Sequence, residues 1–203
     1  MRTRLLVAAF GLLVSLACTS GPPPPPDEAS AIEGVEEWRA AREQIMRDDP
    51  ESPIPEDKRD ALLPLRYYAA DASYIVPAEL DVSSDRPVLE MPTSTGTLRK
   101  MERVGTLRFS LHGQPMTLQA FVEAGQPLES LFVPFADMTT GIDTYAAGRY
   151  LDILPTPTGL YEVNFNRAYN PSCAYNERYE CPYPPASNRL KVAVRAGEKV
   201  PGA

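Results

Sequence analysis

The segment TLRFSLHGQPMTLQAFV, residues 106–122, decides the fold that we expect for this chain. Apolar residues occupy every second position in both of its halves, at 107, 109 and 111 and again at 116, 118, 120 and 122. This period of two is typical of a half-buried β-strand. Between the halves, Gly113 and Pro115 indicate a turn. The segment therefore predicts an antiparallel β-hairpin with its turn at residues 112–115.

Short apolar runs continue this pattern on both sides of the hairpin. They cover residues 74–76, 87–91, 97–104, 131–135, 160–165 and 190–194, for about eight strands in total. The 22 prolines and 12 glycines of the chain favour short strands and rigid loops over long helices. No strand–helix–strand rhythm occurs. The sequence thus predicts one mainly β domain, residues 31–203, built as an antiparallel β-barrel or sandwich with an N-terminal helix packed outside.

The predicted helix covers residues 27–46. Ile32, Val35, Trp38, Arg42 and Ile45 recur three or four positions apart, as on one face of a helix. Ser30 and Glu33 are spaced as a capping box, and Asp49-Pro50 ends the pattern. We expect Trp38 to anchor this helix to the domain.

The charge of the chain argues against one class of partner. The sequence has 20 basic and 27 acidic residues, which gives a net charge of -7. Its basic residues form no run or cluster, so nucleic acid is not an expected partner.

The first residues, MRTRLLVAAFGLLVSLACTS, are a basic start, a charge-free apolar run and small residues before Cys18. They resemble a bacterial lipoprotein signal, with Ser15-Leu16-Ala17-Cys18 as the lipobox. The resemblance implies a signal peptide at residues 1–17, acylation of Cys18, and a Pro-rich tether over residues 18–30 in the polyproline II form. A transmembrane anchor is the first alternative, although the run is shorter than the ~20 residues that a span needs. Plain secretion with cleavage elsewhere is the second.

The same resemblance bears on location. The acyl chains of Cys18 would hold the domain on a lipid bilayer at the cell envelope. Thr19 follows the cysteine where the inner-membrane sorting signal has Asp. In a host with two membranes this favours the outer membrane, with the domain facing the periplasm.

The stretch from Gly148 to Lys199 is unusually rich in Asn, Arg, Tyr and Pro. Strand alternation from residue 160 would place Asn164 and Asn166 on one face and apolar residues on the other. Amides, guanidiniums and phenols at fixed geometry suit recognition of a polar small molecule or an envelope protein, and they also satisfy buried loop carbonyls. The predicted binding residues are Tyr145, Arg149, Asp152, Asn164, Asn166, Arg167, Tyr169, Asn170, Asn188 and Arg189.

Several motifs of this region resemble one known family. They are GRYLD at 148–152, FNRAYNP at 165–171, CPYPP at 181–185, NRL at 188–190 and RAGEK at 195–199, preceded by EMPTSTG at 90–96 and LFVPFADMTTG at 131–141. In this order they are similar to the bacterial domain of unknown function 1684. The resemblance implies a mainly β domain without an established activity. Asn164 stands where the resemblance leads us to expect Asp, which removes a carboxylate.

Cys173 and Cys181 remain as a pair once a leader is removed, so we expect a disulfide between them in an oxidising compartment. A zinc site would need two more ligands, and His112 is the single histidine of the chain. A catalytic cysteine would need a base, for which His112 is again the one imidazole. We expect no metal, and because no nucleotide or phosphate glycine motif occurs, no cofactor.

A hydrolase is the rival hypothesis. It would use Asp137, Asp143 or Asp152 as a general acid–base. It predicts that two of these carboxylates lie near Arg167 or Tyr145 in a closed pocket, with one raised pKa.

Overall fold

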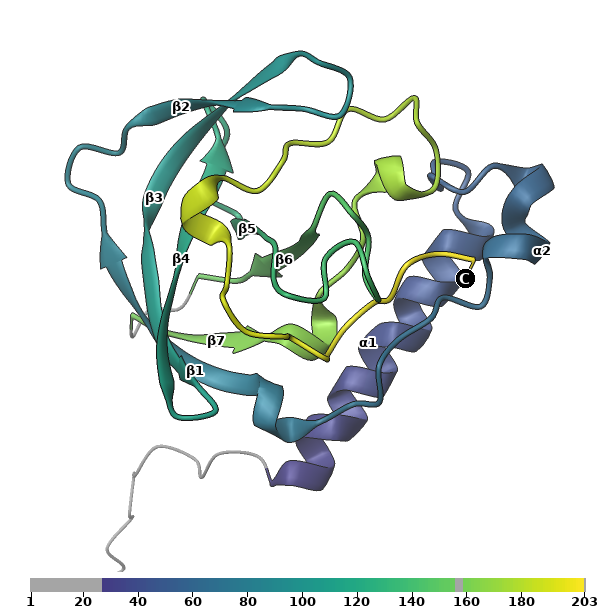
Figure 1. The fold of residues 1–203 in the computed structure, drawn as a ribbon, viewed down its shortest axis with the longest axis horizontal. Coiled ribbons are helices and arrows are strands. Elements are labelled where there is room, and N and C mark those ends of the chain that lie inside the picture. The colour runs from purple at the N-terminus through teal and green to yellow at the C-terminus, as the bar shows by residue number, and fades with distance from the viewer. Residues whose placement is uncertain (1–26, 156–158, 203) are drawn as a thin grey trace, which may run out of the picture.

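The computed structural model describes residues 27–155 and 159–202 (Figure 1). The signal peptide, Cys18 and most of the tether fall outside the described residues. Among the residues that are described, no helix combines the length and the apolar character needed to cross a membrane.

Seven antiparallel strands form one curved sheet, a half-barrel. They are β1 (Ile75–Val82), β2 (Val88–Pro92), β3 (Leu98–Leu111), β4 (Gln114–Glu123), β5 (Leu131–Phe135), β6 (Arg149–Ile153) and β7 (Leu160–Asn164). Their order is β6-β5-β4-β3-β1-β7, with β2 paired to β3. The two end strands, β6 and β7, approach each other (Figure 1). The predicted mainly β antiparallel architecture is confirmed.

The hairpin that decided the expected fold is β3–β4, and its turn is tighter than predicted. Leu111 pairs with Gln114, which leaves His112 and Gly113 as a two-residue loop. Both have positive φ, 50° and 76°, as a type I′ turn requires. The tight turn fixes the register, so that Leu107 pairs with Leu118 and the alternating apolar residues enter one core.

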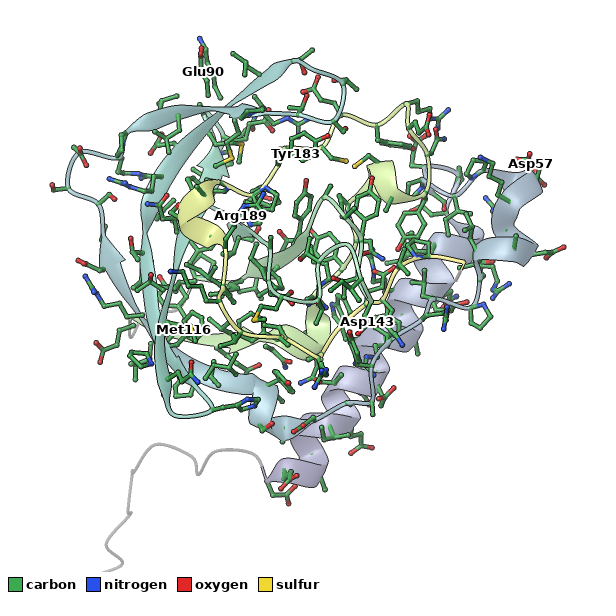
Figure 2. All side chains as sticks on the ribbon, in the orientation of Figure 1. Asp57, Glu90, Met116, Asp143, Tyr183 and Arg189 are labelled. Carbon is green, nitrogen blue, oxygen red and sulfur yellow. The ribbon has the colours of Figure 1, made fainter. Side chains whose placement is uncertain are left out.

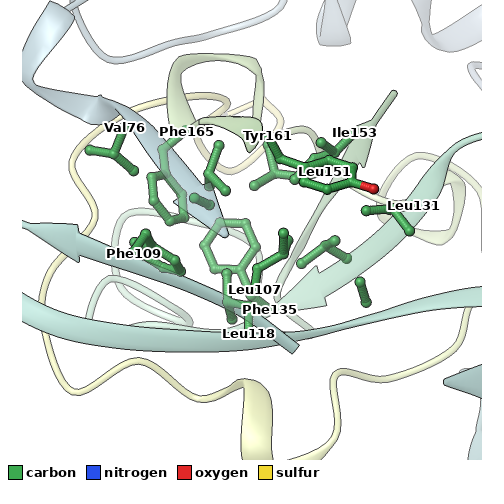
Figure 3. Close-up of a cluster of buried hydrophobic side chains, with 14 of the residues drawn as sticks. Val76, Leu107, Phe109, Leu118, Leu131, Phe135, Leu151, Ile153, Tyr161 and Phe165 are labelled. Carbon is green, nitrogen blue, oxygen red and sulfur yellow. The ribbon is translucent and has the colours of Figure 1, made fainter. Parts of the chain in front are cut away.

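That core fills the concave side of the half-barrel. Its side chains come from β1, β3, β4, β5, β6 and β7 and from Phe165 directly after β7, and Figure 3 shows several of them converging, Phe135, Tyr161 and Phe165 among them. Phe121, expected on the polar face of β4, is fully buried against Met91 and Met101 on the other face of the sheet. Leu89 of β2 and Phe132 of β5 complete this second, smaller cluster.

The helix α1 (Glu28–Asp48) packs outside the half-barrel, as expected (Figure 1). Its N-cap is Asp27, whose Oδ1 accepts the Ser30 amide at 2.8 Å, in place of the predicted Ser30 cap. The buried face carries Val35, Arg39 and Met46, whereas Ile45 is 57% exposed. The predicted apolar face is therefore rotated, because arginines take part in docking.

The remaining described elements are short helices. The helices are η1 (Glu56–Lys58), α2 (Arg59–Leu62), η2 (Ala72–Tyr74), η3 (Phe165–Arg167), η4 (Ser172–Ala174) and η5 (Ala186–Asn188). The strand predicted at residues 190–194 does not form. These residues cross the open side of the half-barrel as the C-terminal segment seen in Figure 1.

Candidate functional site

A buried polar seam joins β6 to the C-terminal segment. We use this name for Asp137, Arg149, Asn166, Asn188 and Glu198, all 9% exposed or less. Arg149 is its centre: Nη2 donates to Asp137 Oδ2 at 2.8 Å and to the Val194 carbonyl at 3.0 Å, and Nη1 donates to the Ala196 carbonyl. Arg149, a predicted binding residue, is fully buried and offers no surface to a ligand. Its guanidinium holds the carbonyls of Val194 and Ala196, at the end of and just beyond the segment 190–194.

The amides of the seam are also occupied by main-chain groups. Asn188 accepts the Gln119 amide at 2.8 Å and donates to the carbonyls of Gln119 and Pro134. Asn166 accepts the Asp71 amide at 3.0 Å and donates to the Asp71 carbonyl at 2.8 Å. Both side chains have no exposed surface. Neither amide presents a group to a ligand, so Asn166 and Asn188 follow the alternative interpretation, in which such amides satisfy buried main-chain groups.

Glu198 is a residue that sequence reasoning did not select. Its carboxylate accepts the Tyr175 hydroxyl, the Asn170 amide at 2.9 Å and Arg42 Nη2 at 3.5 Å. Burial raises the pKa of Glu198, against the opposing effect of Arg42 and Asn170. Asn170, predicted for binding, is buried here and donates its side-chain amide to the Lys199 carbonyl. Glu198 lies within the RAGEK motif, but no local pattern of the sequence marks it as buried.

The β6–β7 cleft is the place where predicted binding residues do meet. It is about 300 Å³ in volume and lies where the two end strands of the sheet approach. Three predicted residues, Asp152, Asn164 and Arg167, share it with Glu162. Its other lining residues are Leu151, Ile153 and Leu154.

The charges of this cleft are separated. Arg167 makes one hydrogen bond, from Nη2 to the Gly34 carbonyl at 3.4 Å, and its buried Nε has no partner among the described residues. No ion pair joins Arg167 to Asp152 or Glu162 in the described part of the chain. A guanidinium with one long hydrogen bond and two acidic side chains that are not paired with it therefore line the same cleft.

Asp152 is held by Tyr169. The Tyr169 hydroxyl donates to Asp152 Oδ2 at 2.6 Å, and the Arg42 guanidinium lies 4.6 Å from the centre of the Tyr169 ring. Loss of hydration raises the pKa of Asp152, although the Tyr169 hydroxyl and Arg42 pull it down. The same loss of hydration, together with Asp152, raises the pKa of Tyr169. Tyr169 does not line the cleft itself, but its hydroxyl orients Asp152, which does.

The comparisons with known proteins agree with the sequence motifs. The model of a family described as "Protein of unknown function (DUF1684)" matches residues 61–199. The chain belongs to the DUF1684 family. A solution NMR structure of an uncharacterized protein from Haloarcula marismortui is similar to it, with 34% identity and a TM-score of 0.68 over 84% of this chain and 95% of that one. No curated protein matches significantly.

Two predicted residues of this DUF1684 domain lie at a different hollow. Tyr145 and Arg189 line a cavity of about 460 Å³ with Ala146, Ala147 and Tyr183. Figure 2 places Tyr183 and Arg189 on the segment that crosses the open side of the half-barrel. The predicted set is therefore divided among the buried polar seam, the β6–β7 cleft and this second hollow.

The three carboxylates of the rival hydrolase hypothesis do not converge. Asp137 is paired with Arg149 inside the seam. Asp143 is exposed and accepts the Tyr68 hydroxyl at 3.1 Å. Asp152 alone shares a cleft with Arg167. The hydrolase hypothesis requires two of these three carboxylates in one pocket, and the structure does not bring any two of them together.

The two cysteines are neighbours, and both are free thiols. The expected disulfide is not formed in this structure. No group of three or more His, Cys, Asp or Glu side chains that could hold a metal occurs among the described residues.

Proposed function

We propose that this DUF1684 domain is a binding module, and that its β6–β7 cleft takes a small zwitterionic molecule. The observation that carries the proposal is the separation of charge in the cleft. Arg167 makes a single long hydrogen bond, to the Gly34 carbonyl, while no ion pair joins it to Asp152 or Glu162 among the described residues. A guanidinium binds a carboxylate through two parallel hydrogen bonds, and acidic side chains accept an ammonium.

The volume and the walls fit this class of ligand. About 300 Å³ is at the small end of ligand pockets. Apolar contact is available from Leu151, Ile153 and Leu154. Asn164 adds an amide that already donates to Glu162 Oε1 at 3.3 Å and so can hold that carboxylate in place. Amino acids and short peptides carry the required pair of charges.

A panel of free amino acids and dipeptides tests the proposal by thermal shift and calorimetry. We expect at least one zwitterion to raise the melting temperature of the wild type. Arg167→Met should weaken its binding by about 10-fold or more, the equivalent of one charge-assisted contact. Arg189→Met is the matched control, since Arg189 is exposed and lies outside the cleft. No binding by any zwitterion, or equal losses in both variants, would refute the proposal.

We further propose that the domain belongs to an envelope lipoprotein anchored through Cys18. The lipobox-like residues 15–18 and the prolines after them support this. Acyl chains would tether an acidic domain to a bilayer that its own charge does not favour. Metabolic labelling with a palmitate analogue checks it: the full chain should be labelled in a bacterial host and Cys18→Ser should not. Equal labelling of the two proteins would contradict an anchor at Cys18.

A further inference from the structure

Cys173 and Cys181 lie against each other in the loop that follows β7. Cys173 is in η4, and Cys181 comes directly before Pro182. The Cys173 amide donates to Cys181 Sγ at 3.1 Å, which brings the second sulfur to the main chain of the first residue. Both thiols are free, with 7% and 6% of the residue exposed. The pair is thus formed by the fold itself, without a covalent bond.

The two thiols differ in access. Cys173 lines a cavity of about 580 Å³, and Cys181 is not among the residues of that cavity. The wall also includes Lys58, Tyr145 and Asn176. A small molecule that enters this cavity therefore contacts Cys173 and not Cys181.

The surroundings favour a thiolate on the accessible residue. The Cys181 thiol is the main hydrogen-bond donor to Cys173, and the Tyr145 hydroxyl lies 3.9 Å from Cys173 Sγ. These contacts outweigh burial and lower the pKa of Cys173 to about 6, whereas the pKa of Cys181 is raised. A thiolate is the nucleophile in exchange with disulfides.

We propose that Cys173 and Cys181 form a redox-active dithiol that exchanges with small-molecule disulfides. The Cys173 thiolate attacks one sulfur of the incoming disulfide, forms a mixed disulfide and releases the other sulfur as a thiolate. Cys181 then loses its proton and attacks Cys173 Sγ, which releases the second thiol. The incoming disulfide is reduced by two electrons to two thiols, and the pair is oxidised to the Cys173–Cys181 disulfide.

This site is separate from the β6–β7 cleft, because no lining residue is shared. A disulfide that serves only as a structural crosslink is the competing interpretation. It predicts a bond that forms once and is not exchanged by thiols under native conditions. The two interpretations differ in reversibility and in which sulfur reacts first.

Oxidised glutathione is the probe, with the reduced full chain and mass spectrometry of its peptides, so that Cys18 is counted apart. The wild type should lose two hydrogens from the Cys173–Cys181 pair and regain them with reduced glutathione. Cys181→Ser should retain a glutathione adduct on Cys173. Cys173→Ser should form an adduct on Cys181 at no more than about one-tenth of the rate at which Cys181→Ser forms its adduct on Cys173. Equal adduct rates, or a wild-type pair that does not return to thiols, would overturn the proposal.

A second measurement needs no variant, in case either substitution prevents folding. Iodoacetamide alkylation of the reduced wild type is followed peptide by peptide against pH. Cys173 should react first and reach half its maximal rate near pH 6, below the value of about 8.5 for a free thiol. Faster reaction at Cys181, or a midpoint at the free-thiol value, would also overturn the proposal.

Discussion

The buried polar seam and the β6–β7 cleft contain the same kinds of residue in different roles. In the seam these residues hold buried main-chain groups, whereas in the cleft they line a hollow. Each has an arginine, an asparagine and a carboxylate from the C-terminal half of the chain. In the seam, Arg149 is fully buried and its donors meet Asp137 and carbonyls. In the cleft, Arg167 is half-buried and makes a single hydrogen bond, to the Gly34 carbonyl, although the Nε of each of the two arginines lacks a partner among the described residues. Residue type therefore says little about role until the local main chain is known.

Two neighbouring asparagines show how the main chain decides. Strand alternation placed Asn164 and Asn166 on the same face. The strand β7 ends at Asn164, and η3 begins at Phe165. The Asn164 side chain caps this turn by accepting the Asn166 amide at 3.2 Å. The turn rotates Asn166 into the protein and leaves Asn164 beside the cleft.

The strongest test of this comparison replaces each arginine by methionine. Arg149→Met leaves the carboxylate of Asp137 and the carbonyls of the C-terminal segment without their buried partner. Breaking a buried charge pair in this way costs about 3–5 kcal/mol. Arg167→Met removes a long hydrogen bond at a half-buried site, and should cost about 1 kcal/mol or less. Urea denaturation of both variants measures the two free energies of unfolding.

Two outcomes would contradict the roles that we assign to Arg149 and Arg167. A mild Arg149→Met would mean that the C-terminal segment is held by its apolar contacts, so that the seam adds little. A severe Arg167→Met would make Arg167 a structural residue. It would then be unsuitable as the binding variant proposed above.

Much of the fold was predictable because the sequence states it locally. The alternation of residues 106–122 fixes the hairpin, and the two-residue turn follows from Gly113 after a residue that also adopts positive φ. The segment 190–194 misled because its apolar residues are buried, as a strand's would be. Its hydrogen bonds go to groups distant in the sequence: the Leu190 amide donates to the Ala136 carbonyl, the Val192 carbonyl accepts the Met138 amide, and the Val194 carbonyl accepts Arg149 Nη2. No local pattern records such a long-range contact.

The site was predictable in composition and less so in arrangement. Asp152, Asn164 and Arg167 were selected together and do share a cleft. Glu162 was missed because an exposed acid on a strand is an ordinary surface residue. Glu198 was missed because a lone acid near a chain end gives no sign of burial. The buried face of α1 was predicted wrongly because it includes a charged residue. Arg39 is buried, and its guanidinium carbon lies 4.5 Å from the centre of the Tyr67 ring.

A smaller effect is expected in the pH dependence of stability, and it comes from Glu198 of the seam. Burial raises the pKa of Glu198 in the folded state. Between about 4.3, the usual value in an unfolded chain, and that raised value, the folded state binds more protons than the unfolded state. The contribution of Glu198 to stability should therefore be full below the unfolded value and fall as pH rises through the folded one.

Glu198→Gln removes this titration and keeps the shape of the side chain. The free energy of unfolding of the wild type minus that of Glu198→Gln should decline with rising pH across this window and then level off. A flat difference for Glu198→Gln would mean that Arg42 and Asn170 offset the burial of the carboxylate. The seam would then tolerate a charge as readily as the cleft does.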